Sequence, residues 1–164
     1  AVQFRNDSLV PNIIQALAAS NLRPSRLELE ITETAMLKDS DRTLEILHEL
    51  RGLGVRIVMD DFGTGYSSLS YLRSFPFDKI KIDGSFIKDL SEKEDAQAII
   101  RAVAGLGSSL GMETTAEGVE TEAQLERVVS DGYTQIQGFL FSKPRSASEI
   151  TKEYFSIHKN AVIA

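Results

Sequence analysis

The sequence predicts an α/β fold of parallel β/α units that form part of a (β/α)8 barrel of the TIM type, with about five strands. Short extended runs alternate with helical segments, and a polar residue stands at or near the end of each run: Glu30, Asp60, Lys81, Glu117 and Gln137. A barrel brings the carboxyl ends of its strands together at one site. An open doubly wound sheet would spread these residues along an edge, so the barrel is favoured.

The first half of the chain is expected to hold two helices and two strands. Apolar residues at helical spacing predict the helices; the first ends before Leu-Arg-Pro and the second at a pair of glycines. Alternation in LELEIT and β-branched residues in VRIVM predict the strands, and the two glutamates of LELEIT share a face. The expected bounds are 7–21 and 39 or 40 to 53 for the helices, and 27–32 and 55–59 for the strands.

The second half repeats this alternation. A short helix is broken by Pro76, a strongly amphipathic helix is closed by Gly111, and Thr121 caps a further helix that ends at Gly132. The expected bounds are 69–75, 96–110, 122–130 and from Ser146 or Ser148 toward 157 for the helices, and 79–83, 113–117 and 134–138 for the strands.

The composition predicts one soluble globular domain. The 164 residues are 42% hydrophobic, and no apolar run approaches the roughly 20 residues that span a bilayer. No cysteine is present, which excludes disulfides, thiolate metal sites and cysteine nucleophiles. The net charge of −6 argues against binding to a nucleic-acid polymer, and nothing in the segment predicts membrane contact.

The stretch DDFGTGYSS, residues 60–68, follows the strand predicted over 55–59. Neighbouring residues on a regular strand point to opposite faces, so Asp60 and Asp61 address one site only if the backbone kinks, which Gly63 and Gly65 permit. A solvated turn with a serine cap is one alternative. A dinucleotide-binding loop is a weaker one, because a serine stands where its third glycine belongs.

The residues at the strand ends predict a metal centre. Glu30, Asp60, Asp61 and Glu117 are carboxylates with Lys81 among them, and hard cations such as Mg²⁺ or Mn²⁺ prefer oxygen ligands. Neither histidine lies at a strand end to suggest zinc. Two cations bridged by Asp60 would suit hydrolysis of a phosphodiester. The alternative is that these groups are ordinary surface charges, but their recurrence at successive strand ends argues against it.

Five segments resemble the EAL domain, the bacterial cyclic di-GMP phosphodiesterase family. They agree with that family in order and spacing over nearly the whole chain, and they read ELEITE, DDFGTGYSSLSYL, KIKID, AEGVET and QGFLFSKP. The resemblance implies a modified TIM barrel that hydrolyses cyclic di-GMP to linear pGpG with two Mg²⁺ or Mn²⁺ ions. It also implies a cytoplasmic site of action, and a membrane-anchored parent protein is compatible with this.

The resemblance assigns roles to individual residues. It makes Glu30 and Asp60 ligands of the first metal and Asp60 and Asp61 ligands of the second, while Lys81 and Glu117 orient the water.

Further positions follow from the same motifs. Glu33 matches a glutamate that anchors the DDFGTGYSS loop, through which a homodimer is expected. Glu120 and Gln137 match residues that line the metal and substrate region, and Asp83 matches an acid beside the lysine.

The Glu-Ala-Leu motif that names the family, itself a source of a metal ligand, does not occur in the sequence. A full barrel needs about 250 residues. Residues 1–164 are therefore expected to be the C-terminal part of a single EAL domain, without its N-terminal strands and inactive alone. A non-hydrolysing cyclic di-GMP receptor is the main alternative function. A metal-independent glycosidase is weaker, because it needs no Asp-Asp pair.

Overall fold

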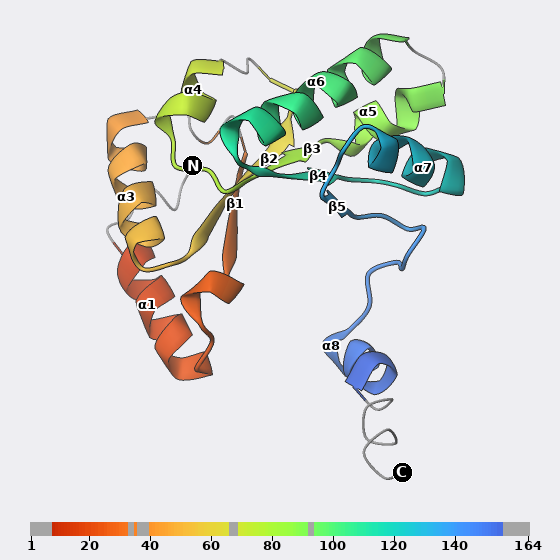
Figure 1. Ribbon diagram of the computed structural model, residues 1–164. Helices are drawn as coiled ribbons and strands as arrows, with labels where there is room; N and C mark the ends of the chain where they lie inside the picture. Colours follow the sequence, from red (N-terminus) through yellow and green to blue (C-terminus); the bar gives the residue numbers. More distant parts are fainter. Residues whose placement is uncertain (1–7, 33–34, 36–39, 66–68, 92–93, 156–164) are drawn as a thin grey trace.

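The computed structural model describes residues 8–32, 35, 40–65, 69–91 and 94–155 (Figure 1). Its centre is a five-stranded parallel sheet in the order β1-β2-β3-β4-β5. This order follows the chain without reversal, as in an arc of a β/α barrel, whereas a doubly wound sheet reverses at a switch point. The predicted partial barrel is confirmed. The strands are β1 Glu28–Thr32, β2 Arg56–Phe62, β3 Lys79–Ile82, β4 Glu113–Ala116 and β5 Gln135–Ile136.

Helices connect the strands, as right-handed crossovers between parallel neighbours require. The α-helices are α1 Leu9–Ser20, α3 Ser40–Gly52, α4 Leu69–Ser74, α5 Gly84–Lys88, α6 Glu94–Leu110, α7 Glu122–Ser130 and α8 Ala147–Ile150. The shorter helical turns are η2 Pro24–Arg26, η3 Asp89–Ser91 and η4 Thr151–Phe155, the last with π geometry.

One face of the sheet is apolar and carries the core. Ile57, Met59, Ile80 and Ile82 are fully or almost fully buried there. Helix α3 contacts β2, and α6 contacts both β3 and β4, so these helices cover the apolar face. Alternation along each strand then directs the intervening residues to the opposite face, which is mostly polar but also holds the buried Val58.

The predicted helices and strands are present, but several bounds differ. The strand predicted over 55–59 continues through both aspartates to Phe62, and the one predicted over 134–138 is reduced to Gln135–Ile136. The last helix ends at Ile150 and passes into η4. Helix α5 was not predicted, because its five residues are too short for a periodic pattern.

Among the residues that the structure describes, no helix is both long enough and apolar enough to cross a membrane.

Tyr133 gives the fold a testable response to alkaline pH. The side chain is buried, its hydroxyl donates to the Ile100 carbonyl oxygen at 3.1 Å, and burial and the nearby Asp131 raise the pKa of Tyr133. An unfolded tyrosine loses its proton near pH 10 but the folded one does not, so the free energy of unfolding falls as pH rises above about 10.

We expect Tyr133→Phe to reduce this alkaline loss and to cost about 1 kcal/mol at pH 7 through the missing hydrogen bond. Urea unfolding of the full-length protein at pH 7 and above pH 10 measures both effects. An unchanged alkaline loss in the variant would contradict the assignment.

Candidate metal centre

Lys81 lies at the centre of a group of carboxylates on the polar face of the sheet. Its Nζ is 2.8 Å from Glu30 Oε1, 2.9 Å from Asp60 Oδ1 and 2.7 Å from Glu117 Oε1. The lysine side chain is only 8% exposed. Strands β1 and β2 supply Glu30 and Asp60, and Glu117 directly follows β4, so parallel pairing brings together residues far apart in the sequence. With Asp61, these residues form what we call the carboxylate cluster.

A β-bulge directs two adjacent aspartates to the same side of the sheet. Met59 pairs with Ile80 and Phe62 with Ile82, so both aspartates of β2 lie opposite the single residue Lys81. Asp61 has φ 55°, in the left-handed region that Asp and Asn tolerate better than most residues. The kink predicted at the two aspartates is present, and Asp61 itself takes the left-handed φ rather than the glycines that follow. Gly63, with φ 95°, makes a second turn after the strand.

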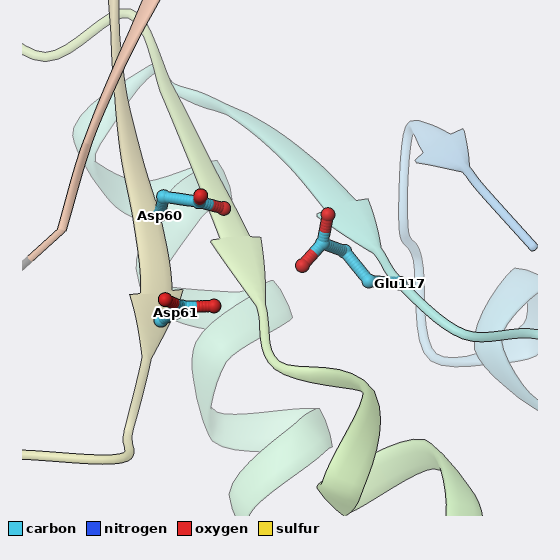
Figure 2. A group of neighbouring side chains, drawn as sticks. All are labelled: Asp60, Asp61 and Glu117. Carbon is cyan, nitrogen blue, oxygen red and sulfur yellow. The ribbon is translucent and has the colours of Figure 1, made fainter.

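The aspartates and Glu117 form a compact group of oxygen ligands. Among the described residues, Asp60, Asp61 and Glu117 each offer a carboxylate oxygen such that all three oxygens lie within 4.8 Å of one another. Figure 2 shows the three side chains extending toward one another across β3. This donor set suits a hard divalent cation. Glu30 belongs to the cluster through Lys81 rather than through these three oxygens.

The charges of the cluster are incompletely balanced. Burial raises the pKa of Asp61, and the neighbouring Asp60 and Asp83 raise it further. Burial likewise raises the pKa of Glu117, although the hydrogen bond from Lys81 opposes this. One ammonium group thus faces more negative charge than it neutralises, and a bound cation would stabilise the ionised acids.

The ammonium form of Lys81 is stabilised. Burial alone would lower the pKa of Lys81, but hydrogen bonds to Glu117, Glu30 and Asp60 outweigh burial and raise it above its usual value. Lys81 therefore stays positively charged at neutral pH, and it can act as a fixed cation but not as a base.

A second group of charges lies on the same face at the amino ends of the strands. Lys79 Nζ is 2.6 Å from Glu28 Oε2, and Arg56 bridges Glu28 at 3.0 Å and Glu113 at 2.8 Å. Gln135 Nε2 donates to Glu113 Oε2 at 2.7 Å. We call these five residues the lower charge network. Its two cations balance its two acids, whereas in the carboxylate cluster Lys81 alone faces four acids.

The structure places the other predicted residues around the cluster. Asp83 caps α5 by accepting a hydrogen bond from the Ser85 backbone N–H at 3.0 Å. Glu120 and Gln137 are exposed, and the described contacts of Gln137 are through its backbone. Glu33 lies outside the described residues, as do residues 66–68 of the DDFGTGYSS segment.

Sequence reasoning missed the side chain of Gln124 and the lower charge network. A signal for Gln124 was present, because Thr121 and Gln124 have the spacing of a capping box, and both halves of that box are formed. The lower charge network had no local signal, since its partners are brought together only by the strand register.

The segment after β5 packs closely on the segment after β4. Val119 N–H donates to the Gln137 carbonyl at 3.1 Å, and Leu140 N–H donates to the Val119 carbonyl at 3.1 Å. A Cβ at Gly138 would overlap the backbone of Val119. Only glycine therefore fits at position 138.

We expect Gly138→Ala to destabilise the full-length protein by about 3 kcal/mol, because the added methyl must push the two segments apart. Gly105→Ala is the matched control. It lies within α6 with no atom near an added Cβ, so it should stabilise by roughly 0.5–1 kcal/mol. Thermal unfolding compares the two, and equal stability of both variants would refute the close packing.

Comparison with known proteins identifies the family. The family model for the EAL domain matches residues 1–144. MucR of Pseudomonas aeruginosa, named a bifunctional diguanylate cyclase and cyclic di-GMP phosphodiesterase, is 45% identical over 150 residues, which are 92% of this chain and 22% of MucR. The chain spans 18% to 22% of the length of the curated relatives it matches first.

Solved EAL structures share the fold. The EAL domain of Mycobacterium smegmatis DcpA superposes with a TM-score of 0.88 at 38% identity, covering 94% of this chain and 70% of that one. Klebsiella pneumoniae BlrP1, solved with manganese and cyclic di-GMP, superposes with a TM-score of 0.81 at 37% identity, covering 87% and 36% of the two chains. Sequence and fold agree, and the chain belongs to the EAL domain family.

Proposed function

We propose that this chain supplies the metal-binding part of a phosphodiesterase that hydrolyses cyclic di-GMP to linear pGpG with Mg²⁺ or Mn²⁺. The observation that carries this proposal is the group of three carboxylate oxygens within 4.8 Å of one another beside the buried Lys81. The names of the relatives support the substrate, and the manganese complex of BlrP1 supports the use of a metal.

The described residues fit a divalent cation. Asp60, Asp61 and Glu117 would hold it. Where two cations bind, Glu30 would serve the first together with Asp60, which would also serve the second. A bound cation lowers the pKa of water and stabilises negative charge on phosphate oxygens.

Glu117 and Lys81 would serve the proton transfer and the orientation that hydrolysis needs. Hydrolysis forms one P–O bond from water and breaks the P–O3′ bond, so that O3′ leaves as a hydroxyl after taking a proton from solvent and the phosphate stays on the 5′ oxygen of pGpG. The proton of the attacking water passes to a carboxylate, for which Glu117 is suitable because it lies beside Lys81 within the carboxylate cluster. Lys81, 2.7 Å from Glu117, orients that carboxylate and offsets phosphate charge.

The test is to incubate the full-length protein with cyclic di-GMP and Mg²⁺ and to follow pGpG by chromatography. We expect turnover that EDTA abolishes and added Mn²⁺ restores. Tight nucleotide binding without turnover would favour the receptor alternative, and turnover that survives EDTA would refute a metal-dependent site.

Two further proposals concern the whole protein. Residues 1–164 are the C-terminal part of a single EAL domain, supported by the match over residues 1–144 and by coverage of 70% of the DcpA chain.

The protein forms a homodimer through the DDFGTGYSS segment. Sedimentation of the full-length protein tests this, and a monomer at all concentrations would refute it.

A further inference from the structure

The side chain of Gln124, at the start of α7, joins the β4–α7 loop to helix α5. Its Oε1 accepts hydrogen bonds from the backbone N–H groups of Glu120 at 2.8 Å and Thr121 at 3.0 Å. Its Nε2 donates to the carbonyl oxygen of Ile87 at 3.2 Å. Two backbone donors point at one amide atom, which must therefore be the oxygen, and this fixes the orientation of the amide.

The loop and the helix that Gln124 joins follow the two strands whose carboxyl ends carry the partners of one ion pair, Glu117 and Lys81. The β4–α7 loop begins at Glu117, whereas Ile87 lies in α5, which starts directly after the strand that carries Lys81. The 2.7 Å contact between Glu117 and Lys81 therefore spans the same two units as the hydrogen bond from Gln124 to Ile87.

The backbones of these units already lie against each other. Gly118 has φ 68°, and a Cβ there would be 3.1 Å from the Cα of Gly84 at the start of α5. The β4–α7 loop and the start of α5 are therefore in direct backbone contact, and the Lys81–Glu117 ion pair lies at the strand ends just before them.

We propose that Gln124 is a positioning residue, whose bond to Ile87 holds the Glu117 carboxylate in place against Lys81. The inference rests on the proposed function for the reaction that this carboxylate serves. The competing explanation is that Gln124 only caps α7, since its Oε1 is half of the capping box.

Two substitutions separate these explanations. Gln124→Glu keeps the acceptor for Glu120 and Thr121 but has no donor for Ile87. Gln124→Lys keeps a donor for Ile87 but has no acceptor for the cap. A positioning role predicts that Gln124→Glu lowers activity and keeps the melting temperature. It predicts that Gln124→Lys keeps activity and lowers the melting temperature.

Gln97 supplies the matched control. Its Nε2 donates to the Leu90 carbonyl at 3.0 Å and its Oε1 accepts from Arg127 at 3.3 Å, so it makes the same kinds of bond. None of these bonds reaches the β4–α7 loop. Gln97→Glu removes an equivalent donor in α6 and should leave turnover unchanged.

The experiment measures kcat, KM for cyclic di-GMP, Mn²⁺ affinity and melting temperature in the full-length protein. We expect Gln124→Glu to lower kcat and Mn²⁺ affinity about 10- to 100-fold, as for residues that orient metal-site groups, with KM and melting temperature near those of wild type. Wild-type kcat and Mn²⁺ affinity in this variant would overturn the proposal, as would an equal loss in Gln97→Glu.

The Mn²⁺ affinity keeps this test separate from the proposed function. If the wild-type protein does not hydrolyse cyclic di-GMP, the proposed function fails. A selective loss of Mn²⁺ affinity in Gln124→Glu would then still support the positioning role, and equal affinities in all variants would overturn it.

Discussion

Asp61→Asn is expected to lower kcat for cyclic di-GMP about 100-fold or more, because it removes one charged oxygen ligand from a site that contributes several kcal/mol to the transition state. The folded protein should be at least as stable as wild type. Asparagine tolerates the left-handed φ of 55°, and the substitution removes a carboxyl whose pKa is raised by burial and by Asp60. Turnover and thermal unfolding in metal-free buffer measure the two effects.

Asp61→Ala is the comparison that separates charge from backbone conformation. It should lose the same activity and, in addition, about 1 kcal/mol of stability, because alanine is strained at positive φ. If Asp61→Asn keeps wild-type turnover, or is destabilised as much as Asp61→Ala, the proposed role of the bulge is wrong.

Lys81→Met should destabilise the metal-free protein by about 3 kcal/mol and abolish turnover. The substitution removes the ammonium group that forms an ion pair with Asp60 and another with Glu117. The side chains of these acids are only 19% and 17% exposed, so their charges would be left unpaired and poorly solvated. Added Mn²⁺ should stabilise this variant more than wild type, since the cation replaces the missing positive charge. Melting temperatures with and without Mn²⁺ give the result.

Lys79→Met is the matched control, two residues earlier on the same face of β3. Lys79 is 6% exposed and lies 2.6 Å from Glu28, so its loss should also destabilise the protein. Turnover by the folded Lys79→Met protein should stay near that of wild type, because the lower charge network does not reach the carboxylate cluster. Equal loss of turnover in the two variants would show that Lys81 contributes only stability.

Much of the fold could be predicted because its signals are local. The helix over 122–130 has the predicted bounds, since Thr121 caps it and Gly132 follows it. The partial barrel followed from polar residues at successive strand ends, and parallel pairing does bring Glu30, Asp60 and Glu117 to Lys81. The helices and strands were predicted from hydrophobic periodicity and helix caps, which are patterns of residues close together in the sequence.

The β-bulge that produces the kink at the aspartates could not be predicted in the same way. The sequence predicts a kink at the aspartates that the following glycines permit, but Asp61 itself takes the positive φ because the register against β3 places the bulge there. The lower charge network was missed for a similar reason, because Glu28 and Lys79 become neighbours only when the sheet forms. Interactions that depend on strand register have no local pattern in the sequence.

The most direct measurement is anomalous diffraction from crystals of the full-length protein grown with Mn²⁺ and cyclic di-GMP. The expected result is an anomalous peak within ligand distance of the carboxylates of Asp60, Asp61 and Glu117, with Lys81 beside the bound phosphodiester. Nucleotide bound at the cluster with no manganese there, or manganese bound only elsewhere, would contradict the assignment of this cluster as the metal centre.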